Sequence, residues 1–316
     1  MNKNLGAKIK FCGSGKLLLT GEYVVLDGAK ALAIPVKFGQ SMEVNNQEDR
    51  NISWTAFDVG EKEWFQCNLN ISDFTLDKGR ESIEVSNLQK IFLAIKKMNP
   101  SFFEIKSGLK FSTHLDFPRH WGLGTSSTLI SMLSKWASVN PFLLLKETFG
   151  GSGYDVACAQ SKSPIIYQLN DQGQSNWESV AYNPSFKDKL YFVYLGKKQN
   201  SRKAITHYRN LQLEKSSIVK EISKITNEIL SIESYDDFHS IIDRHEIIMS
   251  DCLEMPTVKS TRFKDFKGPI KSLGGWGGDF IMVGSKKEKS WIDSYFKERD
   301  CPDVLTYNEM VGEKNG

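Results

Sequence analysis

The chain has 316 residues, of which 40% are hydrophobic and 25% are charged, as in an ordinary folded protein of one large or two average domains. Lysine and arginine number 41 and aspartate and glutamate number 38, so the net charge of +3 is too balanced to indicate a nucleic-acid-binding protein. There is no run of about 18 apolar residues to predict a membrane-spanning helix. A strand pattern is reached by Ile9, so we expect no signal peptide.

The elements predicted in chain order mix strands and helices. Strands are expected where short apolar runs are broken by glycine or where apolar and polar residues alternate, in residues 9–44, 52–69, 109–117, 165–169, 190–195 and 280–283. Helices are expected where apolar residues recur at helical spacing, in residues 88–95, 129–136, 218–229, 238–249 and 291–296. Because the two types do not alternate regularly, an α+β fold is favoured over a doubly wound α/β fold. The polar segment 172–188 predicts a boundary near residue 185, between domains 1–185 and 186–316.

Cysteines and histidines give no metal or redox motif. The five cysteines are far apart, and an odd, scattered set is typical of the reducing cytoplasm. His239 and His245 are not spaced to share one helical face. We therefore expect a cytoplasmic protein without a structural metal ion.

The first glycine segment is Gly13-Ser14-Gly15-Lys16, which invites comparison with a P-loop. The comparison fails because Lys10 stands where the P-loop needs a glycine and Leu17 where it needs the serine or threonine that binds magnesium. Taken alone, a Gly-Lys pair of this kind is usually a surface turn.

The second glycine segment is Gly122-Leu123-Gly124-Thr125-Ser126-Ser127, where a predicted strand ends and a helix begins. The first turn of a helix has unpaired backbone N–H groups and a partial positive charge. The glycines allow a ligand to approach the backbone, and the hydroxyl groups add donors and a possible magnesium ligand. The segment can therefore hold phosphate without a Walker lysine, although a capped core helix is an equal interpretation.

Two further glycine segments follow. Asp155 comes just after Gly151-Ser152-Gly153, where it is either a reactive carboxylate or a helix cap. The segment Gly274-Gly275-Trp276-Gly277-Gly278-Asp279 has four glycines around one tryptophan. Because ordering glycine is costly in entropy, we expect this segment to close over a ligand, with a tight entry into a strand as the alternative.

Together these segments resemble the GHMP kinases, named for galacto-, homoserine, mevalonate and phosphomevalonate kinases. The first, second and third motifs of that family are similar to residues 13–28, 122–127 and 274–279, in family order, and the resemblance spans about residues 8–285. It implies the GHMP kinase fold, an α+β fold with an N-terminal ribosomal protein S5 domain 2-like domain and a C-terminal ferredoxin-like α/β sandwich. It also implies ATP-dependent phosphorylation of a small molecule, with no nucleic acid or membrane as partner.

The resemblance also implies roles for individual residues. ATP would be bound by Gly122, Leu123, Gly124, Thr125, Ser126 and Ser127. Ser126 would be the magnesium ligand, and Lys16 and Asp155 would be the catalytic pair. Implied contacts to the acceptor are Glu22, Tyr23, Ser152, Gly153, Lys197, Ser201, Gly277 and Gly278.

The acceptor suggested by the motifs is 5-phosphomevalonate. Gly21-Glu22-Tyr23 and the string from Gly151 to Ala157 are similar to phosphomevalonate kinases, whereas mevalonate kinases usually have Gly-Glu-His. A phosphate monoester has a second pKa of about 6 and needs cations more than a general base. Four basic residues of a segment after a predicted strand could supply them, unless the segment is only a solvated loop: Lys197, Lys198, Arg202 and Lys203.

Other interpretations remain open. The string Gly153-Tyr154-Asp155-Val156-Ala157 is similar to the "GYDIA" branch of the family, whose substrate is open. Mevalonate kinase, diphosphomevalonate decarboxylase and a non-catalytic ligand-binding homologue are the alternatives. Two departures from the family pattern keep the last of these open: Trp276 replaces a glycine, and only about 23 residues separate Ser127 from Gly151. The presence of Lys16, Ser126 and Asp155 argues against it.

Overall fold

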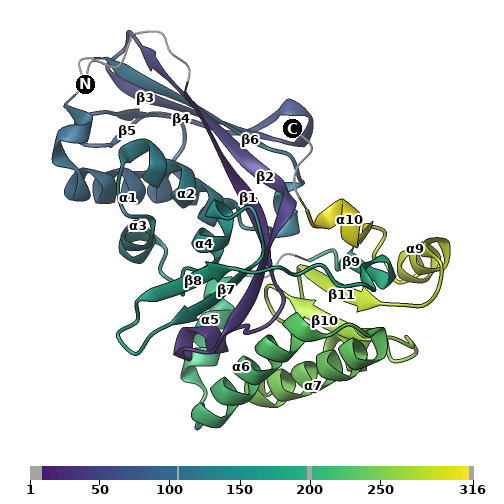
Figure 1. Ribbon diagram of the computed structural model, residues 1–316. Helices are drawn as coiled ribbons and strands as arrows, with labels where there is room; N and C mark the ends of the chain where they lie inside the picture. Colours follow the sequence, from purple (N-terminus) through teal and green to yellow (C-terminus); the bar gives the residue numbers. More distant parts are fainter. Residues whose placement is uncertain (1–8, 105–106, 198–200, 313–316) are drawn as a thin grey trace. The chain divides into compact units, whose positions relative to one another are not determined.

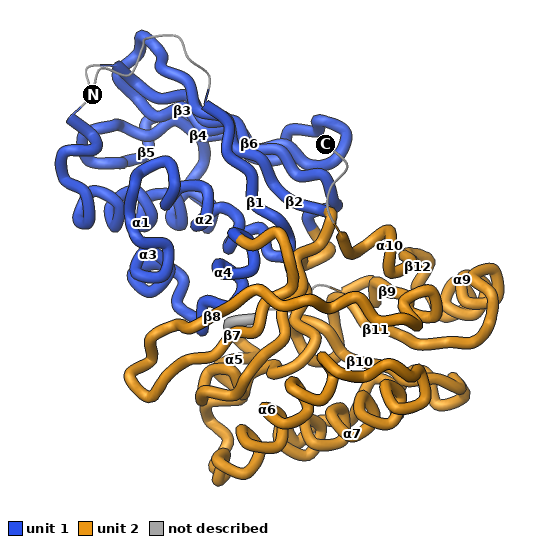
Figure 2. The backbone as a smooth tube through the Cα atoms, viewed as in Figure 1, with its two compact units in different colours: residues 1–15, 38–119, 124–160 blue, residues 16–37, 120–123, 161–316 orange. Residues whose placement is uncertain are grey.

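The computed structural model describes residues 9–104, 107–197 and 201–312 (Figure 1). The chain forms two compact units, which are coloured separately in Figure 2. Unit 1 contains the residues up to 15 together with 38–119 and 124–160, and unit 2 contains 16–37, 120–123 and the residues from 161 onward. Two long strands, β1 (Ile9–Leu18) and β2 (Ala31–Gln47), each contribute residues to both units. The predicted domain boundary near residue 185 stays a prediction.

Unit 1 consists of a sheet with helices packed against it. Its strands follow the order β5-β4-β3-β6-β2, in which β3 and β6 are parallel and the other pairs antiparallel. They are β3 (Asn51–Asp58), β4 (Lys62–Asn70), β5 (Leu76–Lys78) and β6 (Gly108–Leu115). The helices are α1 (Ile83–Met98), α2 (Thr125–Ala137), α3 (Pro141–Thr148) and α4 (Tyr154–Gln160).

The core of unit 1 is aromatic. Alternate residues of β3 are buried, as expected for a strand with one face against helices. Trp54 of β3 stacks on Phe111 of β6 with 4.9 Å between ring centroids, and Trp136 of α2 meets Phe111 edge-on, also at 4.9 Å. Helices α1 and α2 thereby pack against one face of the sheet (Figure 1), which fixes where α2 begins.

Unit 2 is built around a second, antiparallel sheet with the order β10-β11-β9-β12. Its strands are β9 (Leu190–Tyr194), β10 (Ile270–Leu273), β11 (Phe280–Gly284) and β12 (Val304–Thr306). Every residue of β9, β10 and β11 is buried, so helices and loops cover both faces. The helices of the unit are α5 (Ser201–Asn210), α6 (Ser216–Ser231), α7 (Tyr235–Leu253), α8 (Val258–Arg262), α9 (Lys289–Lys297) and α10 (Tyr307–Met310).

The edge hairpin of unit 2 was not predicted in full. Strand β7 (Ile165–Leu169) pairs with the N-terminal part of β2 and with β8 (Ser175–Ser179). Residues 165–169 were expected as a strand, but β8 lies in the polar segment interpreted as a boundary. Because β8 is an edge strand with mostly exposed residues, it lacks the apolar alternation that reveals a strand.

Two other sequence interpretations were wrong. Residues 13–16 are not a turn but part of β1, where a Cβ atom on Gly13 would make a tight contact of 3.1 Å with Cβ of Thr128. Residues 23–26, expected as part of a strand, lie at a 3-10 turn, Val24–Asp27. Val24 and Val25 are buried in that turn, so their apolar character reflects burial and not strand structure. No helix in the described part of the chain is long and apolar enough to cross a membrane.

Candidate functional site

The start of α2 in unit 1 has the properties of a phosphate-binding helix end. Gly124 precedes the helix with φ of 101°, and as the N-cap residue it has no side chain to cap the first turn. The Ser127 hydroxyl donates to the carbonyl of Gly124 at 2.8 Å, and the Thr128 hydroxyl donates to Oε1 of Gln40 at 2.7 Å. Ser127 is therefore turned into the protein, whereas Ser126 is exposed.

Asp155 lies in the first turn of α4, in the same unit. Its Oδ1 accepts a hydrogen bond from the N–H of Val156, the next residue, at 3.0 Å. Val156 joins the core that contains α2, which ties the two helices together. Of the two preceding residues implied as acceptor contacts, Ser152 is half-buried, and Gly153 is buried with φ of 91°.

The glycine loop, residues 274–279, connects β10 to β11 in unit 2. Gly274 and Gly277 both have φ of 76°, in the left-handed region that favours glycine. Asp279 is buried, and its Oδ2 accepts from the N–H of Gly275 at 3.3 Å. A Cβ atom on Gly122 would lie 2.7 Å from Oδ1 of Asp279, so the carboxylate fills the space that glycine leaves. The glycine loop and residues 120–123 are thus fitted together.

Trp276 does not point its side chain into open solvent. The indole is 5% exposed, and its Nε1–H donates to the carbonyl of Pro256 at 3.1 Å. The backbone N–H of Trp276 donates to the hydroxyl oxygen of Tyr23 at 2.9 Å. Tyr23, implied as an acceptor contact by the family resemblance, is therefore also a support of the glycine loop.

Glu22 belongs to a buried ion cluster, defined here as Glu22, His245, Glu246, Lys271 and Ser272. The Lys271 ammonium donates to Oε1 of Glu22 and lies 3.1 Å from Oε1 of Glu246. Ser272 Oγ donates to Oε2 of Glu246 at 2.9 Å, and Nε2 of His245 lies 3.4 Å from Oε2 of Glu22. Glu22, implied as an acceptor contact, is only 2% exposed and is held by protein side chains.

Burial dominates the proton equilibria of this cluster. It raises the pKa of Glu22 to about 7, against the attraction of Lys271 and with the repulsion of Glu246. Burial alone would lower the pKa of Lys271, but the two carboxylates raise it overall. Burial and the charge of Lys271 hold the pKa of His245 well below its usual range, so this histidine is neutral.

Sequence reasoning did not identify Lys271, Glu246 or His245 as part of any site. The available signals were weak: Lys271 is a charged residue inside a short buried strand, and His245 lies on the apolar face predicted for residues 238–249. Their partner Glu22 is more than two hundred positions away, so no local pattern could join them.

Of the remaining predicted residues of unit 2, some are described by the structure and some are not. The N–H of Lys16 donates to the carbonyl of Leu123 at 2.9 Å, and the carbonyl of Lys197 accepts from the N–H of Asp279 at 2.8 Å. The exposed Lys197 is thus next to the glycine loop in the fold. Lys198 lies outside the described residues, as do the side chains of Ser201 and Arg202, while Lys203 is exposed in α5.

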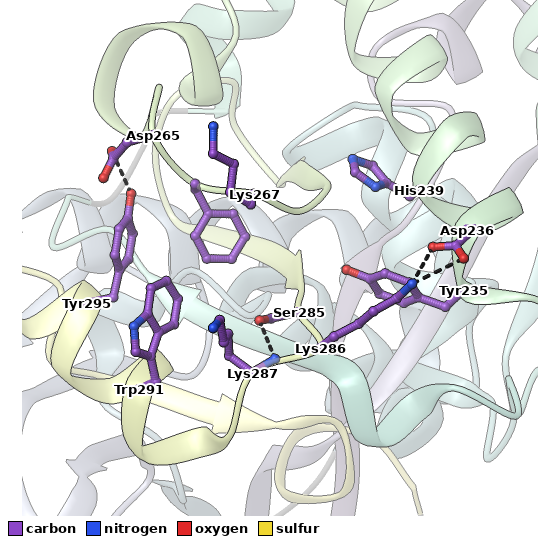
Figure 3. A pocket seen from close by; sticks show the side chains of 11 residues that line it. Tyr235, Asp236, His239, Asp265, Lys267, Ser285, Lys286, Lys287, Trp291 and Tyr295 are labelled. Atoms are coloured by element: carbon purple, nitrogen blue, oxygen red, sulfur yellow. Dashed lines mark hydrogen bonds and ion pairs between the residues drawn. The ribbon is translucent and has the colours of Figure 1, made fainter.

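A pocket of about 520 Å³ lies elsewhere in unit 2, between the start of α7, the segment after α8 and α9 (Figure 3). Some of its polar groups bond to one another: Lys286 donates to Asp236 at 2.8 Å, and the Tyr295 hydroxyl donates to Asp265 at 2.9 Å. Among the described residues that line it, none is a predicted site residue. We therefore do not assign this pocket to the reaction.

The chain is similar to known proteins in sequence and in fold. No protein family model matches the chain. The mevalonate kinase of Methanocaldococcus jannaschii is 23% identical over 322 residues, which cover 93% of this chain and 96% of that protein.

Solved structures resemble the chain over nearly its whole length. The crystal structure of the Methanococcus jannaschii mevalonate kinase has a TM-score of 0.68 and 17% identity, covering 96% of this chain and 98% of that one. The Streptococcus pneumoniae phosphomevalonate kinase in complex with phosphomevalonate and AMPPNP has a TM-score of 0.67 and 16% identity, with 94% and 99% covered. The Lactococcus lactis galactokinase complexed with galactose has a TM-score of 0.65 and 12% identity, with 96% and 94% covered. The predicted α+β class and GHMP kinase fold are confirmed.

Proposed function

We propose that this chain, which has the fold of the GHMP kinases, is an ATP-dependent small-molecule kinase whose acceptor is 5-phosphomevalonate. The observation that carries the proposal is the start of α2, where the N-cap residue is a left-handed glycine, which has no side chain to cap the helix. Unpaired N–H groups at the positive end of a helix favour phosphate oxygens. The three family motifs and the similarity to kinases along nearly the whole chain support the same function.

The residues at the start of α2 fit a nucleotide. The N–H groups of the first turn would bind phosphate oxygens, and the exposed Ser126 hydroxyl would be an oxygen ligand for magnesium. No three His, Cys, Asp or Glu side chains in the described ranges are arranged to hold a metal ion. That fits a magnesium ion that is bound mainly by nucleotide phosphates and water, with one or two protein oxygens. Bound together, ATP and magnesium would supply the transferable phosphoryl group and neutralise part of its charge.

Lys16 and Asp155 are proposed as the catalytic pair. Phosphoryl transfer depends on positioning and charge neutralisation, and a lysine ammonium directed at the transferred group would contribute both. An alcohol acceptor would need Asp155 as a general base. A phosphate monoester is largely ionised at neutral pH, so Asp155 would then mainly orient the acceptor.

Phosphomevalonate is favoured over mevalonate by two features. One is the pair of sequence strings, Gly21-Glu22-Tyr23 and Gly151 to Ala157. The other is the basic segment that begins at the exposed Lys197, whose carbonyl accepts from the glycine loop. Mevalonate kinase is the second candidate, because the mevalonate kinase of Methanocaldococcus jannaschii is similar to this chain over 93% of the chain's length.

A coupled ATPase assay with mevalonate, phosphomevalonate, homoserine and galactose tests the proposal. We expect ATP consumption with phosphomevalonate, and a loss of about 10²–10³ in kcat for Asp155→Asn and for Lys16→Ala, since each removes a preorganised electrostatic group. Asp77→Asn, a change of an exposed aspartate in β5, should keep wild-type turnover. Lack of turnover with all four acceptors would refute kinase activity of this type, and full turnover by Asp155→Asn would refute the catalytic assignment.

A further inference from the structure

We propose that Tyr23 and Trp276 are positioning residues that lock the glycine loop in place before any substrate binds. The inference rests on the proposed function in one respect, namely that the glycine loop contacts a substrate. It gives a role to Trp276, the residue that departs most from the family pattern in this loop.

The lock begins with a strained turn. Tyr23 has φ of 59° and ψ of −49°, and the N–H of Val24 donates to the carbonyl of Glu22 at 2.6 Å. This is a γ-turn of the rare form with positive φ, which is unfavourable for a residue that has a side chain. Such a conformation persists only where the surrounding structure determines it, and it is found mainly at functional sites.

Both sides of the turn are anchored within unit 2. On one side, the Glu22 carboxylate is held by the buried Lys271 ammonium. On the other, Val24 and Val25 are buried in the 3-10 turn. The Tyr23 ring also lies against the ring of Tyr208, with 5.8 Å between centroids. The position of the Tyr23 hydroxyl is therefore set by the fold around it and not by a ligand.

The hydroxyl of Tyr23 supports the middle of the glycine loop. It accepts the backbone N–H of Trp276 at 2.9 Å, while the indole of the same residue donates to Pro256 at 3.1 Å. One residue of a glycine-rich segment is thus tied to two separate parts of the unit. Because glycine has the largest backbone freedom to lose, fixing this loop in advance lowers the entropy cost of closing it on a substrate.

Trp276 replaces a glycine of the family motif, but its side chain does not block access of a ligand to the glycine loop. Its side chain is buried toward Pro256, and the neighbouring Gly277 stays exposed, with no described atom within 4 Å of where a Cβ would be. The tryptophan supplies an anchor, and the exposed Gly277 beside it keeps the backbone open to a ligand.

Two conservative variants test the lock. Tyr23→Phe removes the acceptor for the Trp276 N–H and keeps the ring, and Trp276→Phe removes the donor to Pro256 and keeps an aromatic side chain. In the substrate-free protein, we expect each to speed amide hydrogen exchange in residues 274–278 by about five-fold, the effect of losing one net hydrogen bond. With substrates, the KM of the molecule that the loop contacts should rise about five-fold, while kcat stays within about two-fold.

Two matched controls lose similar groups elsewhere in unit 2. Tyr295→Phe removes a hydroxyl that donates to Asp265 at 2.9 Å, and Trp291→Phe trims a half-exposed indole beside it (Figure 3). Neither should change exchange in the glycine loop or either KM. Unchanged exchange in Tyr23→Phe would overturn the lock. If the wild-type protein phosphorylates none of the acceptors, the proposed function fails, but the exchange result still decides whether the lock exists.

Discussion

The two glycine segments of the candidate site, residues 122–128 at the start of α2 and the glycine loop, are stabilised in opposite ways. At α2 the hydroxyl of Ser127 donates to the carbonyl of Gly124, only three positions away, and the hydroxyl of Thr128 donates to Gln40. The glycine loop is held by Tyr23, about 250 positions earlier in the chain. The start of α2 is therefore held partly by bonds within its own first turn, whereas the glycine loop depends on the folding of unit 2 around it.

The glycine loop also depends on the buried ion cluster. It lies next to the turn at Tyr23 and at the start of the glycine loop, because Lys271 and Ser272 belong to β10 and Glu22 precedes Tyr23. Buried charges are costly to remove singly, since the partner is left without compensation. Breaking the cluster should consequently disturb the glycine loop far more than the start of α2.

The largest effect is expected for Lys271→Met, which leaves Glu22 and Glu246 buried without a cation. We predict a loss of about 3–5 kcal/mol in the free energy of unfolding at pH 8, measured by urea denaturation. Lys286→Met, which breaks the exposed pair with Asp236, should cost no more than about 1 kcal/mol.

The stability that Lys271→Met loses should depend on pH and should be larger at high pH than at low pH. The native pKa of Glu22 is raised to about 7, above its unfolded value of about 4.3, so the native state binds the extra proton and stability falls as pH rises through this interval. Without Lys271 the native pKa is higher still, so the gap between variant and wild type is widest above pH 7 and narrows toward about pH 5. His245, also freed from the charge of Lys271, would shift the gap in the same direction. If Lys271→Met lost the same free energy of unfolding at pH 8 and at pH 5, the assigned charge states would be wrong.

A smaller loss of stability is expected when the contact between Gly122 and Asp279 in unit 2 is disturbed. Gly122→Ala places a side chain at φ of 72° and a Cβ only 2.7 Å from the Asp279 carboxylate, so it should strain the backbone and displace Asp279. Gly150→Ala has a similar φ of 67° with no described atom within 4 Å, so it isolates the cost of the left-handed backbone, about 1–2 kcal/mol. Thermal unfolding should show a larger loss for Gly122→Ala. Equal losses would mean that the fit between Gly122 and Asp279 has no energetic weight.

This contrast also explains how much could be predicted from the sequence. The helix after Gly124 and the strands β1 to β4, β6, β7, β9 and β11 were predicted because glycine, hydroxyl and apolar residues follow local patterns. The short strands β5, β8, β10 and β12 were not predicted. The interpretation of residues 23–26 as a strand failed because burial in a 3-10 turn gives the same apolar run. The anchors of the glycine loop were missed because Lys271, Pro256 and Tyr23 are joined only by the tertiary fold. The roles of Lys16, Ser126 and Asp155 stay predictions.

The acceptor is tested most directly by phosphorus NMR of the product formed from ATP with phosphomevalonate or with mevalonate. We predict that phosphomevalonate gives ADP and a diphosphate with two coupled resonances. Lys197→Ala should raise the KM for phosphomevalonate and leave kcat and the KM for ATP largely unchanged, with a smaller effect at high salt. A wild-type protein that yields only a phosphomonoester from mevalonate, or that releases carbon dioxide from a diphosphate, would contradict the proposed function.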